Sequence, residues 1–366
     1  MPQAPRRIGV LTGGGDCPGL NAVIRAVTKS AIFDHGIEVF GIADGFLGLI
    51  EDRVRHLSAD NVSNILTLGG TILGSSNRAD PQRFAIGYDA DGSPQFKDVT
   101  DDCMKTLRKY EIDTLAVIGG DGTMSGARNF VERGVNCIGL PKTIDNDLEG
   151  TDITFGFLTA VQIATDALDR LHTTASSHGR VMVVELMGRN AGWITLHAGV
   201  ASGADVLLIP EIPYDLGSVR DFIKDRVARG KRCSIVCVSE GARAKGGKQV
   251  VARLDPTSPD PVRLGGIGAQ LAGEIERVTN IETRATVLGH VVRGGTPVSA
   301  DRVLGTQFGH HAVRLIAEGK RNRLVVMKDN RLTDVDITVA ANTQRLVPAD
   351  HHLIAAAKAV GTCFGD

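Results

Sequence analysis

The stretch Thr114-Leu115-Ala116-Val117-Ile118-Gly119-Gly120-Asp121-Gly122-Thr123 decides the fold of this 366-residue chain. Its first five residues form an apolar run that is typical of a fully buried strand. The glycines that follow leave backbone N–H groups uncovered, and Asp121 adds a carboxylate suited to a divalent metal. Loops at the carboxyl ends of parallel strands are where α/β proteins bind ligands. The stretch therefore predicts a strand and a ligand-binding loop, the loop holding phosphate and a metal.

A second polar loop follows the next apolar run. Residues 137–140 predict another buried strand, and Pro141-Lys142-Thr143-Ile144-Asp145-Asn146-Asp147 comes directly after it. Asp145 and Asp147 stand at i and i+2, so one carboxylate can act on a substrate hydroxyl while the other orients it or reaches toward the metal. The alternative is an Asx-rich turn that caps the next helix. A loop that binds phosphate, a metal site and a general base together suggest phosphoryl transfer to an alcohol.

A third glycine loop, Gly13-Gly14-Gly15-Asp16, ends the first expected strand and precedes a helix. Bare backbone can approach phosphate oxygens there, and the amino terminus of the helix attracts the anion. The run matches neither GxGxxG nor GxxxxGK, so alone it is a weak signal. The loop at 119–123 is stronger, although GGDG-type loops occur in several unrelated kinases and a simple βα turn is its alternative. These loops suggest a kinase without naming the substrate.

Strands and helices alternate along the chain. The apolar patterns predict strands at 8–12, 37–42, 114–118, 137–140, 180–186, 205–209 and 234–239, and helices at 18–31, 100–110, 124–133, 154–174, 191–201 and 218–229. This alternation predicts an α/β fold of two lobes, each a mostly parallel sheet with helices on both faces, with the active site in the cleft between them. The polar stretches 88–94 and 244–265 predict a surface turn and an exposed hairpin or loop.

The composition excludes several classes of protein. The net charge is −1 and the pI about 6.8, so nothing favours nucleic acid or a membrane surface as a partner. No run approaches the ~18 apolar residues of a membrane helix, and residues 1–7 lack an apolar segment with a cleavage site. A cytoplasmic location is therefore expected. The six cysteines lack the paired spacing of a zinc site and are expected to be reduced and mostly buried.

Cationic residues gather in the second half of the chain. Four arginines lie at or near expected strand ends: Arg180, Arg189, Arg284 and Arg293. Arginine binds phosphate in a bidentate manner, and four at equivalent sheet edges suggest a sugar-phosphate pocket. Glu240 ends the strand at 234–239 and can accept hydrogen bonds from sugar hydroxyls. His290 is either part of this pocket or a satisfied core histidine.

Taken together, these runs resemble the 6-phosphofructokinase family, of the phosphofructokinase A type and its mixed ATP/pyrophosphate group. The similarity runs from Ile8 to about Arg321. Besides the loops at 119–123 and 143–147, the matching runs are Gly15-Asp16-Cys17-Pro18-Gly19-Leu20-Asn21, Met187-Gly188-Arg189, Glu282-Thr283-Arg284-Ala285-Thr286-Val287-Leu288-Gly289-His290 and Arg293-Gly294-Gly295. Their order, spacing and number make coincidence negligible.

The resemblance implies Mg²⁺-assisted transfer of a phosphoryl group from ATP to the 1-hydroxyl of fructose 6-phosphate, a reaction of glycolysis that gives fructose 1,6-bisphosphate and ADP. Asp145 matches the family's base, and Asp147 belongs to the same catalytic set. Thr143 and Arg189 match the groups that hold the transferring phosphoryl. Asp121 matches the acid associated with magnesium.

The resemblance also implies the binding residues, the assembly and the domains. The nucleotide set is Gly14, Arg78, Gly120, Asp121, Gly122 and Thr123. The sugar-phosphate set is Thr143, Ile144, Asp145, Arg180, Met187, Gly188, Arg189, Glu240, Arg284, His290, Val291, Val292 and Arg293. Arg180 and Arg284 match residues that reach across from a neighbouring subunit, which implies a homodimer or homotetramer. The nucleotide and metal lobe then comprises residues 1–156 and 292–342, and the fructose 6-phosphate lobe residues 157–291 and 343–366.

Two positions bear on the phosphoryl donor. Pyrophosphate users of the family resemble one another in carrying Asp and Lys at the positions of Gly122 and Lys142, whereas the best-known ATP users carry Gly at both. This chain is mixed. A carboxylate at position 122 crowds and repels the α-phosphate of a nucleotide, whereas glycine leaves room for it, so ATP is favoured and pyrophosphate is the alternative. Lys142 can reach a phosphate of either donor as a point charge, unless it is simply a solvated lysine at a strand end.

Two further readings have less support. A lipid or dinucleotide kinase can share the loop at 119–123, but the loop at 143–147 and the arginine set argue against it. A catalytically dead regulatory subunit is disfavoured because Asp121, Asp145, Asp147 and Arg189 are all present. Regulation departs from the family pattern: His172 replaces an arginine of the usual effector site, which puts the usual effector response in doubt.

Overall fold

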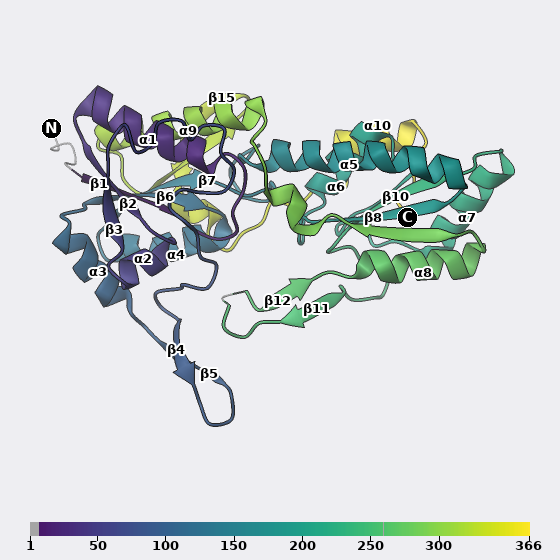
Figure 1. Ribbon diagram of the computed structural model, residues 1–366, viewed down its shortest axis with the longest axis horizontal. Helices are drawn as coiled ribbons and strands as arrows, with labels where there is room; N and C mark the ends of the chain where they lie inside the picture. The colour runs from purple at the N-terminus through teal and green to yellow at the C-terminus, as the bar shows by residue number, and fades with distance from the viewer. Residues whose placement is uncertain (1–6, 259) are drawn as a thin grey trace.

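The larger of two lobes is built on a seven-stranded sheet. The computed structural model describes residues 7–258 and 260–366. The strand order is β15 (Arg331–Asp336), β14 (Arg323–Lys328), β7 (Asn136–Pro141), β6 (Thr114–Gly119), β1 (Arg7–Thr12), β2 (Glu38–Ile42) and β3 (Val54–Leu57). The inner strands run parallel, and within this sheet the described residues pair in antiparallel fashion where β15 joins β14 and β3 joins β2. Parallel strands need covered faces, so helices lie on both sides (Figure 1).

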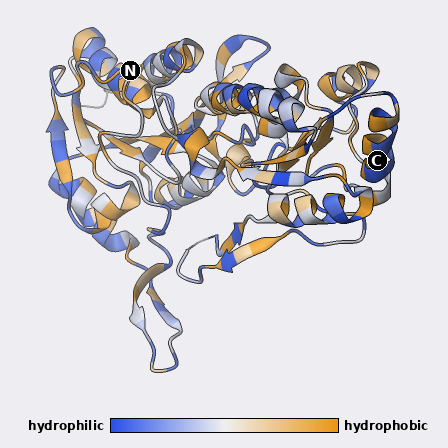
Figure 2. Cartoon of the chain, turned by 45° about the vertical axis from the view of Figure 1, so that its right-hand side comes forward, coloured by the Kyte–Doolittle hydropathy of each residue, from blue (hydrophilic) through white to orange (hydrophobic). Residues whose placement is uncertain are grey.

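Alternate side chains of this sheet enter two different cores. On one face, α1 (Leu20–His35) and α9 (Ser299–Ala317) pack together over residues such as Val10. On the other face, α2 (Phe46–Ile50), α3 (Thr100–Lys109) and α4 (Asp121–Glu132) cover residues such as Leu11. Neighbouring strand residues therefore point to opposite faces, as a period of two requires. The inner strands of both sheets are largely hydrophobic in Figure 2.

The second lobe holds a four-stranded, fully parallel sheet. Its order is β13 (Thr283–Val287), β8 (Val181–Leu186), β10 (Ser234–Ser239) and β9 (Val206–Leu208). Val184 faces the core that α5 (Phe157–His178) and α6 (Trp193–Ser202) share, and Val183 faces α7 (Leu216–Ala228) and α8 (Ile267–Thr279). Both sheets confirm the predicted α/β fold of two lobes with mostly parallel sheets and helices on both faces.

Two hairpins extend from the lobes. The hairpin of β4 (Phe84–Tyr88) and β5 (Pro94–Lys97) projects from the larger lobe, with the predicted surface turn between its strands. The hairpin of β11 (Val251–Leu254) and β12 (Val262–Leu264) lies within the predicted exposed stretch and extends back toward the larger lobe (Figure 1). The remaining elements are η1 (Gly289–Arg293), η2 (Ile337–Ala340) and α10 (His352–Ala359).

Glycines move some helix starts away from the predicted ones. α1 begins at Leu20 instead of residue 18 because Gly19, with φ 104°, forms its N-cap. α5 begins at Phe157 instead of residue 154 because Gly156, with φ 96°, does the same. Such values of φ lie in the left-handed region that glycine tolerates. Each of these two helices therefore starts directly after its glycine.

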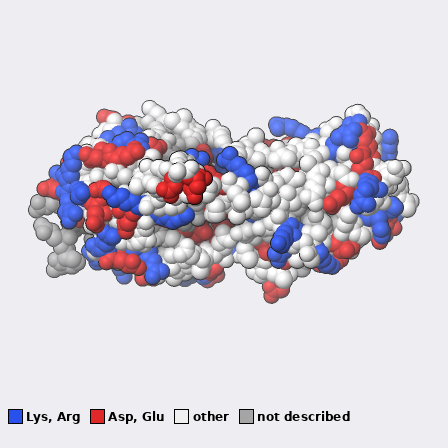
Figure 3. Space-filling model, turned by 90° about the horizontal axis from the view of Figure 1, so that it is seen from below, with Lys and Arg blue, Asp and Glu red and all other residues white. Residues whose placement is uncertain are grey.

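The cysteines, the surface charge and the helices agree with the composition. All six cysteines are free: Cys17, Cys103, Cys137 and Cys237 are buried, and Cys233 and Cys363 are half-buried. On the face drawn in Figure 3, acidic and basic side chains are interspersed. Among the helices of residues 7–258 and 260–366, none combines the length and apolarity needed to span a bilayer.

Candidate active site

The loop after β7 is held in one shape by hydrogen bonds to Thr154. The Thr154 N–H donates to Asn146 Oδ1 at 3.0 Å, and its hydroxyl donates to the Thr143 carbonyl oxygen at 2.7 Å. Asn146 adopts a left-handed backbone (φ 53°), which asparagine tolerates better than most residues. The Thr143 hydroxyl also accepts from the Asp145 N–H at 3.1 Å. The loop thus buries both aspartates, leaving Asp145 only 7% and Asp147 8% exposed.

Asp145 has a buried carboxylate oxygen, Oδ1, without a hydrogen-bond partner among the described residues. Burial raises its pKa, and the positive charges of Arg293, Arg189 and Lys142 oppose that rise. A buried acceptor without a partner is costly unless a ligand supplies one. The loop therefore presents a proton acceptor among cations.

Asp147 is affected by burial in the same way. Burial raises its pKa to about 7, and the charges of Asp145 and Asp121 add to the effect. Crowded carboxylates raise one another's pKa because two negative charges repel. The structure therefore brings three predicted acids near one another at the carboxyl ends of β6 and β7.

The glycine loop after β6 leads directly into α4. Thr123 is buried and packs so tightly that a Cβ on Gly119 would lie 2.2 Å from it, and one on Gly13 2.7 Å. Asp121 lies in the first turn of α4, and its Oδ1 accepts from the Gly122 N–H at 2.7 Å. A Cβ on Gly122 would meet nothing within 4 Å. The loop therefore combines a helix amino terminus, which attracts anions, with open space at position 122.

Lys142 is buried, and the alternative of a solvated strand-end lysine is wrong. Its side chain is only 4% exposed, and its ammonium group donates to the Gly15 carbonyl oxygen at 2.5 Å. Burial lowers its pKa. A Cβ built on Gly14, whose φ of 77° favours glycine, would lie 3.4 Å from Nζ. Lys142 thus joins the loop after β7 to the glycine loop after β1.

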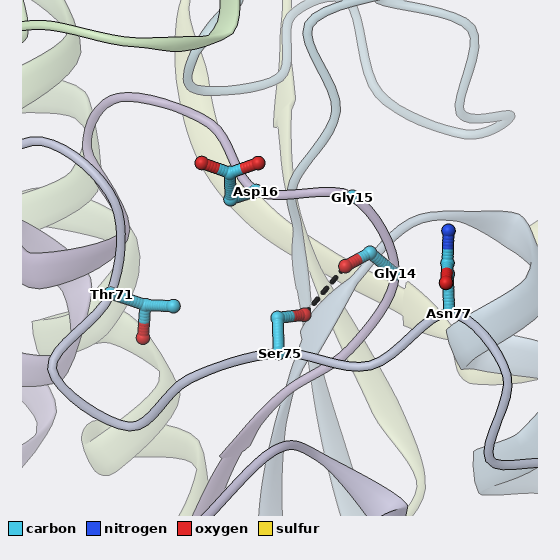
Figure 4. A pocket seen from close by; sticks show the side chains of 6 residues that line it. All are labelled: Gly14, Gly15, Asp16, Thr71, Ser75 and Asn77. Atoms are coloured by element: carbon cyan, nitrogen blue, oxygen red, sulfur yellow. Dashed lines mark hydrogen bonds between the residues drawn. The ribbon is translucent and has the colours of Figure 1, made fainter.

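A cavity of about 350 Å³ opens beside that first glycine loop, lined by Gly14, Gly15, Asp16, Thr71, Ser75 and Asn77. The Ser75 hydroxyl points at the Gly14 carbonyl oxygen and donates to it at 2.5 Å (Figure 4). Thr71, Ser75 and Asn77 were not among the predicted site residues. Their signal in the sequence is the run of small and hydroxyl residues around Gly74.

Arg189 and Glu240 form one unit at the carboxyl ends of β8 and β10. Arg189 has a left-handed backbone (φ 53°), and its N–H donates to Glu240 Oε1 at 3.1 Å. Burial raises the pKa of Glu240 to about 7. The guanidinium of Arg189 pairs with Asp260, which lies next to β12. Gly188 and the half-buried Met187 lead into this unit.

The η1 segment brings Arg293 to the first glycine loop. Its Nη1 donates to the Asp16 carbonyl oxygen at 3.1 Å. Val292 is buried, whereas Val291 is 66% exposed. His290 is exposed as well, so the alternative of a core histidine is wrong. Arg293, which lies in the second half of the chain, thereby contacts the first glycine loop of the larger lobe.

Two of the four arginines lie elsewhere. Arg180 immediately precedes β8, and Arg284 is the second residue of β13, so both lie near the amino ends of these parallel strands. Arg189 and Arg293 follow the carboxyl ends. Both amino-end arginines pair with Glu282, at 2.7 and 2.5 Å. The expectation that the four arginines lie at equivalent sheet edges is therefore wrong. The amino and carboxyl ends of parallel strands lie on opposite sides of the sheet, and two of the arginines lie on each side.

Arg78 lies at the edge of the predicted nucleotide set. Its side chain is 64% exposed and pairs with Asp255 at 3.3 Å. Asp255 follows β11 directly. The hairpin thus supplies acidic partners to two predicted site residues, Asp260 to Arg189 and Asp255 to Arg78.

The acids suit a magnesium ion that arrives with a nucleotide. Among the described residues, no group of three His, Cys, Asp or Glu side chains is arranged to hold a metal. Mg²⁺ commonly binds one or two carboxylates and completes its shell with substrate phosphates and water. Asp121, half-buried in the first turn of α4, fits that arrangement.

Comparisons with known proteins agree with this site. The model of the family described as Phosphofructokinase matches residues 7–316. The ATP-dependent 6-phosphofructokinase 2 of Clostridium perfringens is 48% identical, and the match covers 100% of each chain. The pyrophosphate–fructose 6-phosphate 1-phosphotransferase of Amycolatopsis methanolica is 45% identical over 94% of this chain and 97% of its own.

Solved structures share the fold. A phosphofructokinase from Saccharomyces cerevisiae superposes with a TM-score of 0.76 at 29% identity; the match covers 92% of this chain and 45% of the yeast chain, so this chain spans less than half of that longer one. A pyrophosphate-dependent phosphofructokinase from Nitrosospira multiformis has a TM-score of 0.80 at 19% identity, over 95% of this chain and 87% of that one. On these matches, the chain belongs to the phosphofructokinase family.

Proposed function

We propose that this chain is an ATP-dependent 6-phosphofructokinase, which transfers a phosphoryl group to the 1-hydroxyl of fructose 6-phosphate in glycolysis. The observation that carries the proposal is Asp145, whose buried Oδ1 lacks a partner while the charges of Arg189, Arg293 and Lys142 act on it. A phosphorylated sugar supplies a hydroxyl that can donate to the carboxylate and a phosphate that the arginines can bind. The names of the relatives support this substrate.

Asp145 accepts the proton of the 1-hydroxyl as the oxygen attacks. Its raised pKa brings its basicity closer to neutral pH, which favours proton transfer. A positioned base is typically worth roughly 10²–10⁴ in rate. Thr143, whose hydroxyl binds the Asp145 N–H, holds this loop while the proton moves.

Positive charges stabilise the phosphoryl group during its transfer. Arg189 acts from the smaller lobe, and Lys142 and the amino terminus of α4 act from the larger lobe. Once Arg189 has exchanged Asp260 for the phosphate, these donors need no further rearrangement during the chemical step, which is the main source of electrostatic catalysis. Asp121 would hold the Mg²⁺ that neutralises the charge of the donor phosphates.

ATP is the donor that the site favours. A Cβ on Gly122 would meet nothing within 4 Å, so this position adds neither a side chain nor a charge that would oppose a nucleotide phosphate. Overall identity does not separate the donors, because the ATP-dependent and pyrophosphate-dependent relatives named above differ by only three percentage points, at 48% and 45%. Pyrophosphate is the second candidate, and the buried Lys142 is the observation that favours it.

The test is the reaction itself. Purified protein is incubated with fructose 6-phosphate, ATP and Mg²⁺, and the sugar product is identified by ³¹P NMR. The proposal expects a new phosphomonoester on carbon 1 in an amount equal to the ADP formed. ADP released without sugar bisphosphate would contradict it.

The proposal extends to assembly and lobe boundaries. Arg180 and Arg284, near the amino ends of β8 and β13, would serve a neighbouring subunit's sugar-phosphate site in a homodimer or homotetramer. The exposure of Arg284, at 54%, supports that role, and Arg180 is half-buried beside it. The chain would cross between the lobes near residues 156, 291 and 342. The expected cytoplasmic location stays a prediction.

A further inference from the structure

Three side-chain amides form a row that ends on Asp147. Gln249 Nε2 donates to Asn190 Oδ1 at 3.2 Å, and Asn190 Nδ2 donates to Gln344 Oε1 at 3.1 Å. Gln344 Nε2 then donates to Asp147 Oδ2 at 3.2 Å. None of the three amides belongs to the predicted site.

The order of donors in this row follows from chemistry. The ionised form of Asp147 only accepts hydrogen bonds, and the NH₂ group of Gln344 faces it as that form requires. The Gln344 carbonyl oxygen then faces Asn190, which must donate, and the Asn190 oxygen is left to accept from Gln249. With Asp147 ionised, each amide therefore has one orientation that satisfies its neighbours.

The row connects the loop after β7 with the loop after β8, and the proposed reaction needs these two loops in a fixed relative position. Asp147 belongs to the loop after β7 in the larger lobe, whereas Asn190 directly follows Arg189 at the end of β8 in the smaller lobe. Gln344 lies between them, on the segment that leads from η2 to α10.

Backbone contacts hold the same segment in place. Gln344 forms an antiparallel bridge with Leu148, and the Arg345 N–H donates to the Asp147 carbonyl oxygen at 2.7 Å. On the other side, the Trp193 indole donates to the Arg345 carbonyl oxygen at 2.9 Å. The segment is therefore fixed to the catalytic loop and to α6 at once.

We propose that Gln344 is a positioning residue, which sets the Asp145–Asp147 loop relative to Arg189 through its two hydrogen bonds to Asp147 and Asn190. The inference rests on the proposed function, because it assumes that Asp145 and Arg189 act on one phosphoryl group. Reacting groups must be aligned closely, and small displacements lower the rate without abolishing binding.

The kinetic test compares Gln344→Leu with Thr343→Val. Leucine keeps much of the volume and removes both hydrogen bonds, whereas the adjacent Thr343 hydroxyl donates to the Val339 carbonyl oxygen. Gln344→Leu is expected to lower kcat roughly tenfold while KM for fructose 6-phosphate and ATP stays within about twofold. Thr343→Val is expected to leave both constants within about twofold. A kcat of Gln344→Leu within twofold of wild type, or a fall equalled by Thr343→Val, would overturn the proposal.

A double-mutant cycle with Asp147→Ala assigns the effect to the contact. Adding Gln344→Leu to Asp147→Ala should lower kcat by less than about twofold, because the acceptor is already gone. A further loss close to tenfold would show that Gln344 acts elsewhere and would overturn its role through Asp147.

Hydrogen exchange tests the inference without the reaction. Gln344→Leu should speed amide exchange in residues 143–148 and at Asn190, and Thr343→Val should not. Unchanged exchange in both variants would contradict positioning. If the wild type forms no fructose bisphosphate, the proposed function fails, and the exchange result still decides whether Gln344 holds the loop.

Discussion

The ammonium group of Lys142 donates to the carbonyl oxygen of Gly15 at 2.5 Å and thereby joins the loop after β7 to the loop after β1. The contact holds the lysine Nζ inside the protein, where burial lowers its pKa and the nearby charge of Asp145 opposes that lowering. A charge held this way is already oriented when a phosphate arrives.

Asp145→Ser should separate chemistry from binding. The serine leaves the arginines and the glycine loops in place, so the affinity for fructose 6-phosphate should change little. Without the carboxylate, kcat should fall by roughly 10²-fold or more. Steady-state kinetics and a sugar-phosphate titration measure the two effects. Turnover within about threefold of wild type would remove Asp145 from the role of base.

Gly122→Asp should weaken ATP use and spare the sugar. A Cβ at this position meets nothing within 4 Å, so the fold can accept the aspartate. Its carboxylate would repel the nucleotide's phosphates, and KM for ATP should rise about tenfold, which corresponds to ~1.4 kcal/mol. KM for fructose 6-phosphate should stay within about twofold. Gly122→Ala is the uncharged control, and an unchanged KM for ATP in Gly122→Asp would mean that the nucleotide binds elsewhere.

Glu240→Gln should change how stability depends on pH. Burial raises the pKa of Glu240 to about 7, whereas an unfolded glutamate titrates near ~4.3. Between these values the folded state binds more protons than the unfolded state, so this group's stabilising contribution is lost as pH rises toward 7. Glutamine keeps an acceptor for the Arg189 N–H and carries no charge.

The measurement for Glu240 is urea unfolding at two pH values. The gain in stability of Glu240→Gln over wild type should be larger at pH 8 than at pH 5.5. Asp147, whose pKa burial also raises to about 7, titrates in both proteins and cancels in the comparison. An equal difference at both pH values would show that Glu240 does not titrate in this window.

Asp260→Asn should improve binding of the sugar phosphate. Asp260 pairs with the Arg189 guanidinium, and a phosphate bound by Arg189 must displace that carboxylate. The variant should lower KM for fructose 6-phosphate severalfold. Asp255→Asn, which releases Arg78 instead, is the matched control on the same hairpin and should leave that KM unchanged. A KM that rises in Asp260→Asn would mean that the aspartate aids binding.

The regular elements could be predicted because their patterns are local. The strands β1, β6, β7, β8 and β10 each form a continuous apolar run, and the loops after β6 and β7 carry their polar residues within a few positions. Elements after residue 239, such as β14 and α9, were not predicted from periodicity.

The rest of the site depends on contacts between distant parts of the chain. Gln344 and Asp147 are 197 residues apart, and Arg293 and Asp16 are 277 apart, so no local pattern announces either contact. The predicted position of Arg180 is wrong for a different reason. It lies close to a strand in sequence, but it precedes the strand, and that difference of a few residues moves it to the opposite end of the sheet.

A comparison of the two donors decides whether the site uses ATP or pyrophosphate. Formation of fructose 1,6-bisphosphate from fructose 6-phosphate with Mg²⁺ is measured with ATP and with pyrophosphate in parallel, and kcat/KM is determined for each donor. The open space at Gly122 predicts turnover with ATP and little or none with pyrophosphate. Efficient turnover with pyrophosphate and none with ATP would mean that Lys142 outweighs the glycine, and would contradict the assignment of ATP as donor.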